Sequence, residues 1–170
     1  MEMNFSDFVE LVSKHEKPVI LLEGRRELPE SDRPLLVKLG EKLAKTLPNA
    51  IFRSGNAKGA DNAFIEGVAL VDPSRIENLV PDEKTRKEYI PKGSSTFLLT
   101  DFLQVMEERL EYETLRASPQ RADMIKSRKK NRMLEAKSKY LLRDTLKVIG
   151  YGHKLPQPIA AIFYVNPDEP

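Results

Sequence analysis

The sequence predicts an α/β protein with a Rossmann-like, three-layer α/β/α fold and a mainly parallel sheet. Short apolar runs at residues 18–22, 50–52 and 159–165 alternate with longer segments in which apolar side chains recur at helical spacing. Because these runs are apolar on both faces, they are typical of parallel strands that helices cover from both sides. The 170 residues suffice for a sizeable core, and we expect one domain over residues 1–170.

The chain begins with a helix, a strand and a second helix. Phenylalanines and valines within residues 5–12 share one helical face, and the first strand follows at residues 18–22. Ser31 or Asp32 can cap the next helix, which has Pro34 in its first turn and a stripe of leucines on one side. This order is the start of a βαβ unit.

The middle of the chain continues the alternation. The strand at residues 50–52 leads through a glycine-containing loop to a helix over residues 62–71. Residues 76–80 fit a third strand, and residues 81–92 read as a charged loop of a kind that often controls ligand access. A longer helix is expected over residues 102–116.

The last third of the chain is mainly helical. The Ser-Pro pair at residues 118–119 is a cap followed by proline at the first helical position, so it begins another helical segment. Residues 126–132 contain no hydrophobic side chain, which predicts a break before a helix over residues 131–148. The last strand, residues 159–165, is continuously apolar and is therefore expected to lie in the centre of the sheet.

The most informative stretch joins the second strand to the following helix and reads Arg53-Ser54-Gly55-Asn56-Ala57-Lys58-Gly59-Ala60-Asp61. Its two glycines permit a sharp turn and let a ligand approach without a Cβ in the way. The helix that follows points free N–H groups and its positive dipole end at the same place. Lys58 adds a cation, and Asp61 falls in the first helical turn. These features predict an anion-binding loop, with a tight strand-to-helix turn as the alternative.

Residues 52–61 resemble the S-G-G-A-K-G-A-D signature of the SLOG superfamily, with Asn56 standing where a glycine is usual. That superfamily includes the Lonely Guy phosphoribohydrolases, DNA-processing protein A and molybdenum-cofactor carrier proteins. The pair Gly24-Arg25 is similar to the G-S-R exit of the family's first strand, and Asn131-Arg132 resembles its R-N helix start. The resemblance covers residues 17–165.

The resemblance implies binding of a nucleotide or another phosphorylated small molecule, by a carrier, a sensor or an enzyme of unknown reaction. The ligand-binding residues that it implies are Gly24, Arg25, Ser54, Gly55, Asn56, Ala57, Lys58, Gly59, Ala60, Asp61 and Asn131. The N–H groups of residues 56–60 would hold the phosphate, with Lys58 and Arg25 supplying charge. Asp61 would orient either a sugar or the loop itself. A nucleotide is the candidate cofactor.

The sequence lacks the catalytic segment that Lonely Guy enzymes use to hydrolyse an N-glycosidic bond. Lonely Guy enzymes carry a P-G-G-x-G-T-x-x-E segment. Residues 91–96 match it only loosely, and they precede the basic helix, whereas the family's segment follows it. Without the glutamate of that segment, hydrolysis of an N-glycosidic bond lacks a general acid catalyst. A phosphoribohydrolase is therefore the third alternative, after a small-molecule-binding protein and a nucleic-acid-binding module. The chain has no cysteine, and His15 and His153 lie in no metal-ligand spacing. We therefore expect no metal site and assign no catalytic residue.

Charge is distributed unevenly. Residues 116–149 contain eleven Lys or Arg and three Asp or Glu, so this segment carries +8 while the whole chain carries +2. Such a segment is either a solvated helix, a contributor to the ligand pocket, or a nucleic-acid interface like that of DNA-processing protein A. Only Tyr140 offers an aromatic ring there, which disfavours stacking of single-stranded bases.

Three further expectations concern the whole protein. No run approaches the roughly 18 apolar residues that span a bilayer, and the N-terminus lacks a signal-peptide pattern, so we expect a cytoplasmic protein without membrane contact. Similar proteins continue past residues 166–170 into another loop and helix, which predicts a pattern cut short at its carboxyl end. An apolar surplus at Phe102, Leu103, Met106, Leu110, Ala122, Ile125 and Met133 predicts a homodimer.

Overall fold

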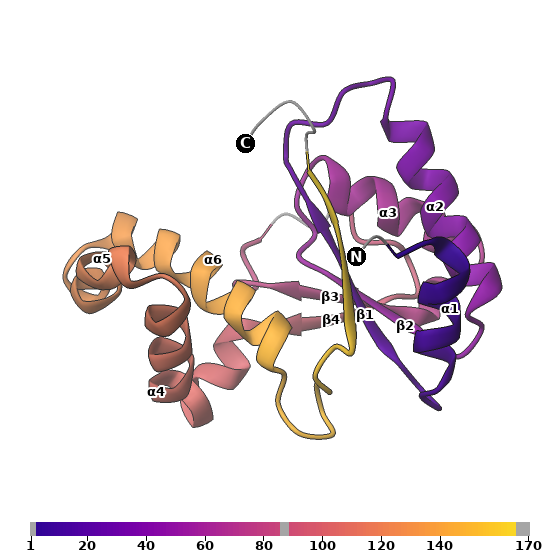
Figure 1. Ribbon diagram of the computed structural model, residues 1–170. Coiled ribbons are helices and arrows are strands. Elements are labelled where there is room, and N and C mark those ends of the chain that lie inside the picture. Colours follow the sequence, from indigo (N-terminus) through magenta and orange to yellow (C-terminus); the bar gives the residue numbers. More distant parts are fainter. Residues whose placement is uncertain (1–2, 86–88, 166–170) are drawn as a thin grey trace.

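A computed structural model describes residues 3–85 and 89–165, and it shows five parallel strands in one sheet (Figure 1). The strand order is β4-β3-β2-β1-β5. The strands are β1 (Val19–Gly24), β2 (Ile51–Ser54), β3 (Ile76–Val80), β4 (Ser95–Leu98) and β5 (Ala160–Tyr164). Helices flank this sheet, so the predicted Rossmann-like α/β class is confirmed.

One face of the sheet is covered by α1 (Phe5–Ser13), α2 (Arg33–Thr46) and α3 (Ala60–Ala69). The buried side chains of this layer include Ile20, Leu22, Leu43, Phe52, Phe64 and Ile76. The backbones of α2 and α3 touch where two glycines meet. A Cβ at Gly40 or at Gly67 would come closer than 3.0 Å to a carbonyl oxygen of the opposite helix. These glycines therefore set how closely the two helices pack.

The opposite layer is formed by α4 (Leu99–Ala117), α5 (Ala122–Ser127) and α6 (Arg132–Ile149), which extend beyond the sheet as a helical lobe (Figure 1). Short 3₁₀ turns at Pro119–Arg121 and Arg128–Lys130 flank α5, and another, Pro73–Arg75, precedes β3. The turn before α6 confirms the predicted helix break. Asn131 caps α6 by accepting from the N–H groups of Met133 and Leu134.

The apolar surplus expected to form a dimer interface is largely internal. Phe102, Met106, Leu110 and Ile125 are buried in a second core together with Leu79 of β3 and the inner face of α6. Leu103 packs against the same core, while Met133 is exposed. The helices α4, α5 and α6 cover one another within a single chain, so this surface gives no reason to expect a second copy.

The prediction that the last strand is central is wrong. In the described sheet β5 pairs with β1 alone and forms an edge. Ile162 and Tyr164 pack into the first core, but Phe163 points the other way and is 59% exposed. Residues 86–88 of the charged loop and the terminal segment 166–170 lie outside the described residues. Within the described ranges, no helix combines the length and apolar character needed to cross a membrane.

Candidate functional site

A cavity of about 600 Å³ lies at the carboxyl ends of β1, β2 and β3, the edge at which open parallel sheets bind ligands. It is lined by Arg26, Gly55, Asn56, Ala57, Lys58, Lys84, Thr85, Tyr89, Tyr140 and Arg143. Three strand exits and the middle of α6 thus supply its wall. We call this space the loop cavity.

The loop between β2 and α3 has the backbone that its sequence predicts. Asn56 has a φ of 53°, in the left-handed region where asparagine replaces glycine most easily. Gly59 has a φ of 100° and caps α3. A Cβ at Gly59 would come closer than 3.0 Å to the carbonyl oxygens of Arg25 and Arg26. Gly59 is therefore required by contact with the loop after β1, and its expected role in admitting a ligand stays a prediction.

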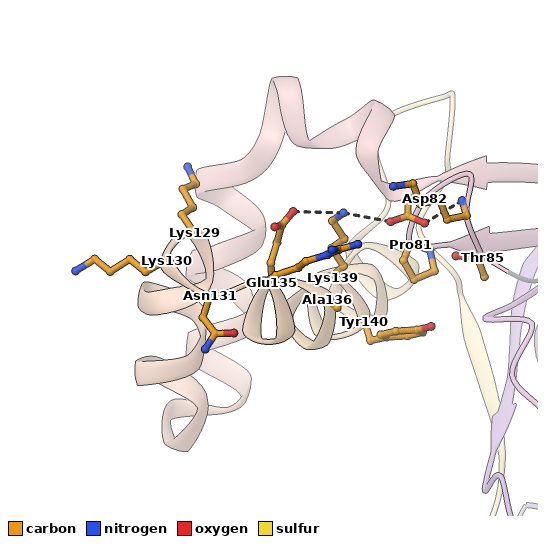
Figure 2. Close-up of a pocket in the computed structure, with 12 residues that line it drawn as sticks. Pro81, Asp82, Thr85, Lys129, Lys130, Asn131, Glu135, Ala136, Lys139 and Tyr140 are labelled. Atoms are coloured by element: carbon orange, nitrogen blue, oxygen red, sulfur yellow. Dashed lines mark hydrogen bonds and ion pairs between the residues drawn. The ribbon is translucent and has the colours of Figure 1, made fainter.

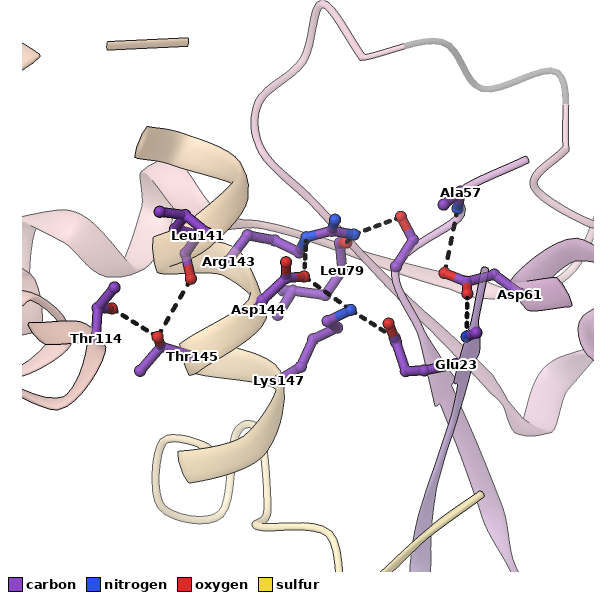
Figure 3. A network of polar contacts seen from close by, with 12 residues as sticks. Glu23, Ala57, Asp61, Leu79, Thr114, Leu141, Arg143, Asp144, Thr145 and Lys147 are labelled. Atoms are coloured by element: carbon purple, nitrogen blue, oxygen red, sulfur yellow. Dashed lines mark hydrogen bonds and ion pairs between the residues drawn. The ribbon is translucent and has the colours of Figure 1, made fainter. Parts of the chain in front are cut away.

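Asp61 holds the glycine loop in place. Its carboxylate accepts from the Gly24 N–H at 3.0 Å and from the Ala57 N–H at 3.4 Å, and the residue is 2% exposed (Figure 3). Burial raises the pKa of Asp61, against the attraction of Lys147 and the two N–H groups. Of the two roles predicted for Asp61, this geometry fits orientation of the loop rather than contact with a sugar.

Two of the five N–H groups expected to hold a phosphate have other partners. The Ala60 N–H donates to the Arg25 carbonyl at 3.0 Å, and the Ala57 N–H donates to Asp61. Within the described residues, the N–H groups of Lys58 and Gly59 have no acceptor. The side of the loop that remains able to bind an anion is therefore the side of Lys58 and Gly59, next to the positive end of α3.

Arg143 of α6 ties the glycine loop to the third strand. It donates to the Gly55 carbonyl at 2.6 Å and to the Leu79 carbonyl at 3.2 Å (Figure 3). A Cβ at Gly55 would collide with the Arg143 guanidinium, so this glycine makes room for the arginine. The same guanidinium lies 5.6 Å from the Tyr140 ring centroid, and Arg26 lies 5.9 Å from it. Tyr140 is thereby held at the cavity wall by two cations.

An ionic layer lies between the sheet and α6, beneath the loop. Lys147, which is 2% exposed, pairs with Glu23 of β1 and lies 2.9 Å from Asp144 (Figure 3). Arg53 of β2 is fully buried, pairs with Glu77 at 2.7 Å and donates to the Lys147 carbonyl. Burial raises the pKa of Glu23 from 4.5 to about 7, against the attraction of Lys147. Burial also lowers the pKa of Arg53.

The charge of the loop cavity is of one sign. Its described lining contains four cations, Arg26, Lys58, Lys84 and Arg143, and no carboxylate. The carboxylates of Glu23 and Asp61 lie behind the wall and face Lys147 and Arg143. Arg26, Lys58 and Lys84 are exposed, whereas Arg143 is buried and lies 3.1 Å from Asp144. A cavity with these walls attracts anions, because three cations are exposed while the nearby acids are already compensated.

The structure separates the predicted binding residues into three groups. Gly55, Asn56, Ala57 and Lys58 line the loop cavity. Behind it lie Gly24, Arg25, Ser54, Ala60, Asp61 and the Cα of Gly59, whose N–H belongs to the peptide bond with the lining residue Lys58. Ser54 is fully buried, and its hydroxyl has no hydrogen-bond partner among the residues described. Asn131 lines a neighbouring cavity instead.

Six of the residues that form the wall lie outside the predicted set: Arg26, Lys84, Thr85, Tyr89, Tyr140 and Arg143. Arg26 directly follows the predicted Arg25, and its role could have been proposed from the same strand exit. Tyr140 and Arg143 are three residues apart and so share a face of α6. That spacing was the one available signal that this face of the basic helix turns toward the sheet.

Comparison of the chain with models of protein families, with curated proteins and with solved structures gives no match. The comparisons therefore add nothing to the resemblance between residues of this chain and the SLOG signature. One fold of this class hosts many functions, so the information on function lies in the site itself.

Proposed function

We propose that this chain binds a nucleotide or another phosphorylated small molecule in the loop cavity. The observation that carries the proposal is the wall itself, in which four cations and no described carboxylate surround the start of α3. Phosphate is favoured there by the helix dipole, by the N–H groups of Lys58 and Gly59, and by charge-assisted hydrogen bonds from the cations.

Two tyrosines favour a nucleotide over a smaller phosphate ester. Tyr89 and Tyr140 line the same cavity as the cations, and each is 41% exposed. A nucleobase stacks on an aromatic side chain with a gain of about 1–3 kcal/mol. The wall thus offers both groups that a nucleotide needs, a cationic end for the phosphate and an aromatic surface for the base.

Binding, as by a carrier or a sensor, fits the wall better than hydrolysis does. The described lining of the loop cavity supplies no carboxyl group that could protonate a leaving base. The third alternative, a phosphoribohydrolase, therefore gains no support from these residues. SLOG kinship and a homodimer remain proposals that follow from the resemblance. A cytoplasmic location remains a proposal from the sequence, which shows no apolar span or signal-peptide pattern.

A nucleic-acid-binding module is the second candidate function, and one observation favours it. A further cavity adjoins the loop cavity (Figure 2), and its wall has five basic and two acidic residues. Lys84, Thr85 and Tyr140 line both cavities. A basic groove with an aromatic residue in it is the arrangement used to bind single strands.

Calorimetric titration with inorganic phosphate and with the four nucleoside 5′-monophosphates tests the proposal. Lys58→Ala should weaken binding of the monophosphates by about 1–3 kcal/mol, which is roughly 5- to 150-fold in Kd, because a charge-assisted contact is lost. Lys38→Ala, which removes an exposed cation of α2, is the matched control and should leave Kd unchanged. No binding to the unaltered protein at millimolar concentration, or equal Kd values for Lys58→Ala and the control, would contradict the proposal.

A further inference from the structure

The strand β5, drawn in yellow in Figure 1, is a sheet edge without charged side chains. It pairs with β1 on one side, and no strand of the described residues lies on its other side. Residues 155–165 contain no charged residue. Natural proteins usually protect a sheet edge with charges or a cover, because its unpaired N–H and C=O groups bind other strands. The opposite edge, β4, exposes the polar side chains of Ser95 and Thr96 instead.

The hydrogen bonds of β1 show which backbone groups of β5 face outward. Neighbouring residues of a strand direct their N–H and C=O groups to opposite sides. The Pro18 carbonyl accepts from the first residue of β2, so Ile20, two residues further on, also faces β2. Ile20 is paired with Ala160, and in a parallel pair only one residue directs its groups into the ladder. Ala160 therefore faces β1, whereas Ala161 and Phe163 direct their N–H and C=O groups to the free edge.

The same two residues also expose their side chains. Ala161 is exposed, and Phe163 and Val165, which follow at every second position, are more than half exposed. Phe163 is paired with Glu23, whose carboxylate meets Lys147, so this row lies on the α6 side of the sheet. Within the described residues, the N–H groups of Ala161 and Phe163 have no acceptor. An apolar row beside an unpaired backbone is the surface that an added strand covers.

A second copy of β5 fits this edge. Antiparallel pairing about a two-fold axis brings the same edge of two identical chains together. An axis through Ile162, the middle residue of β5, overlaps the two strands over their whole length. Ala161 then lies opposite the partner's Phe163, so each ring meets a small side chain, and each such pair exchanges two hydrogen bonds. We propose that the protein forms a two-fold dimer through β5, which joins the two sheets into one.

The register also matches the exposed side chains beyond the strand. The axis through Ile162 places Val165 opposite the partner's Ile159, and both side chains are apolar and exposed. No charge meets a like charge, because residues 155–165 contain none. Any extended segment could satisfy the backbone groups. The match of Ala161 with Phe163, and of Ile159 with Val165, is a property of this strand with itself and selects a second copy as the partner.

Sedimentation equilibrium at micromolar to millimolar concentration tests the inference. The unaltered protein should have the mass of two chains. Phe163→Lys should raise the dissociation constant of the dimer by about tenfold or more, because two apolar cross-strand pairs are lost and a charge is placed on the edge. Tyr112→Lys, which changes a similarly exposed aromatic residue of α4, is the control and should leave the dissociation constant unchanged.

Ala161→Pro tests whether the interface uses the backbone. Proline removes an N–H group that faces the free edge and leaves the pairing of β5 with β1 intact, and proline is tolerated at such positions of edge strands. The expected result is a folded monomer. Circular dichroism spectra and thermal midpoints that match the unaltered protein show that this variant and Phe163→Lys are folded.

A single cysteine tests the register. The groups of Ile162 face β1, so the two Ile162 residues form a non-hydrogen-bonded pair with Cα atoms about 4.5 Å apart. A disulfide accepts Cα separations of about 4.4–6.8 Å. Because the chain has no cysteine of its own, Ile162→Cys should give a covalent dimer under mild oxidation, seen on a non-reducing gel. Tyr112→Cys, at an exposed position of α4, should give none.

Each result decides for or against the β5 dimer. A monomer at every concentration overturns the inference. A dimer that both Phe163→Lys and Ala161→Pro leave unchanged, or that Ile162→Cys fails to cross-link, uses another surface and overturns it as well. The described lining of the loop cavity contains no residue of β5, so nucleotide titration of the same variants tests the proposed function separately.

Discussion

Replacing Glu23 by Gln should remove a pH dependence that the ionic layer gives to folding. The pKa of Glu23 is about 7 in the native state, because burial outweighs the attraction of Lys147, and its ordinary value is 4.5. Between these two pH values the native state retains a proton that the unfolded state has released. The contribution of Glu23 to stability is therefore greatest below pH 4.5 and falls as the pH rises toward 7.

The size of the effect follows from the difference in pKa. Each pKa unit corresponds to about 1.4 kcal/mol, so a rise from 4.5 to about 7 corresponds to about 3 kcal/mol of unfolding free energy. Most of this change falls between pH 5 and pH 8. Asp61 shifts in the same direction and interacts with the same lysine, so the magnitude belongs to the cluster rather than to one carboxyl group.

Urea unfolding at pH 5 and pH 8 measures the effect directly. The free energy of unfolding of the unaltered protein, relative to Glu23→Gln, should increase by about 2–3 kcal/mol when the pH is lowered from 8 to 5. Glu108→Gln, at an exposed position of α4, is the control and should show no such change. The reasoning would be refuted if the unfolding free energy of the unaltered protein, relative to that of Glu23→Gln, were the same at both pH values or increased with rising pH.

Two glycine substitutions test the geometry of the loop. Gly59→Ala should destabilise the protein by more than the roughly 1–3 kcal/mol of backbone strain, because the new Cβ also collides with the Arg25 and Arg26 carbonyls. Gly93→Ala has a similar φ of 94°, but its Cβ would meet only Pro73 at an ordinary contact distance of 3.6 Å, so urea unfolding should show the smaller loss for this variant. Gly40→Ala should cost about 1–3 kcal/mol by separating α2 from α3, and an unchanged unfolding midpoint would contradict that packing.

The sequence predicted the loop well because its signals are local. Two glycines and an asparagine at fixed spacing, between an apolar run and a helix start, are sufficient to place a strand-to-helix turn. The left-handed backbone of Asn56 was predictable for the same reason. The cap of α6 by Asn131 and the break before it also follow from neighbouring residues.

The remainder of the site depends on contacts between distant residues. Lys147 and Glu23 are 124 positions apart, and no periodicity indicates that this lysine is buried rather than solvated. Half of the predicted set lies behind the cavity wall, since a motif identifies a loop but not which of its side chains face the open space. The order of strands is likewise a property of the whole chain, so an apolar run at β5 could not reveal that it forms an edge.

Helical periodicity also does not show which surface covers an apolar helix face. The face of α4 that we assigned to a partner packs instead on α5 and α6 of the same chain, with Phe102 and Ile125 in one core. A pattern of apolar residues shows that a face is buried, but it contains no information on whether the covering surface comes from the same chain.

The most direct test of the central claim is a crystal structure of the protein soaked in phosphate. We expect phosphate in the loop cavity, within hydrogen-bond distance of the N–H groups of Lys58 and Gly59 and of at least one cation of the wall. Phosphate bound elsewhere, with only water beside these two N–H groups, would contradict the assignment of this loop as an anion site.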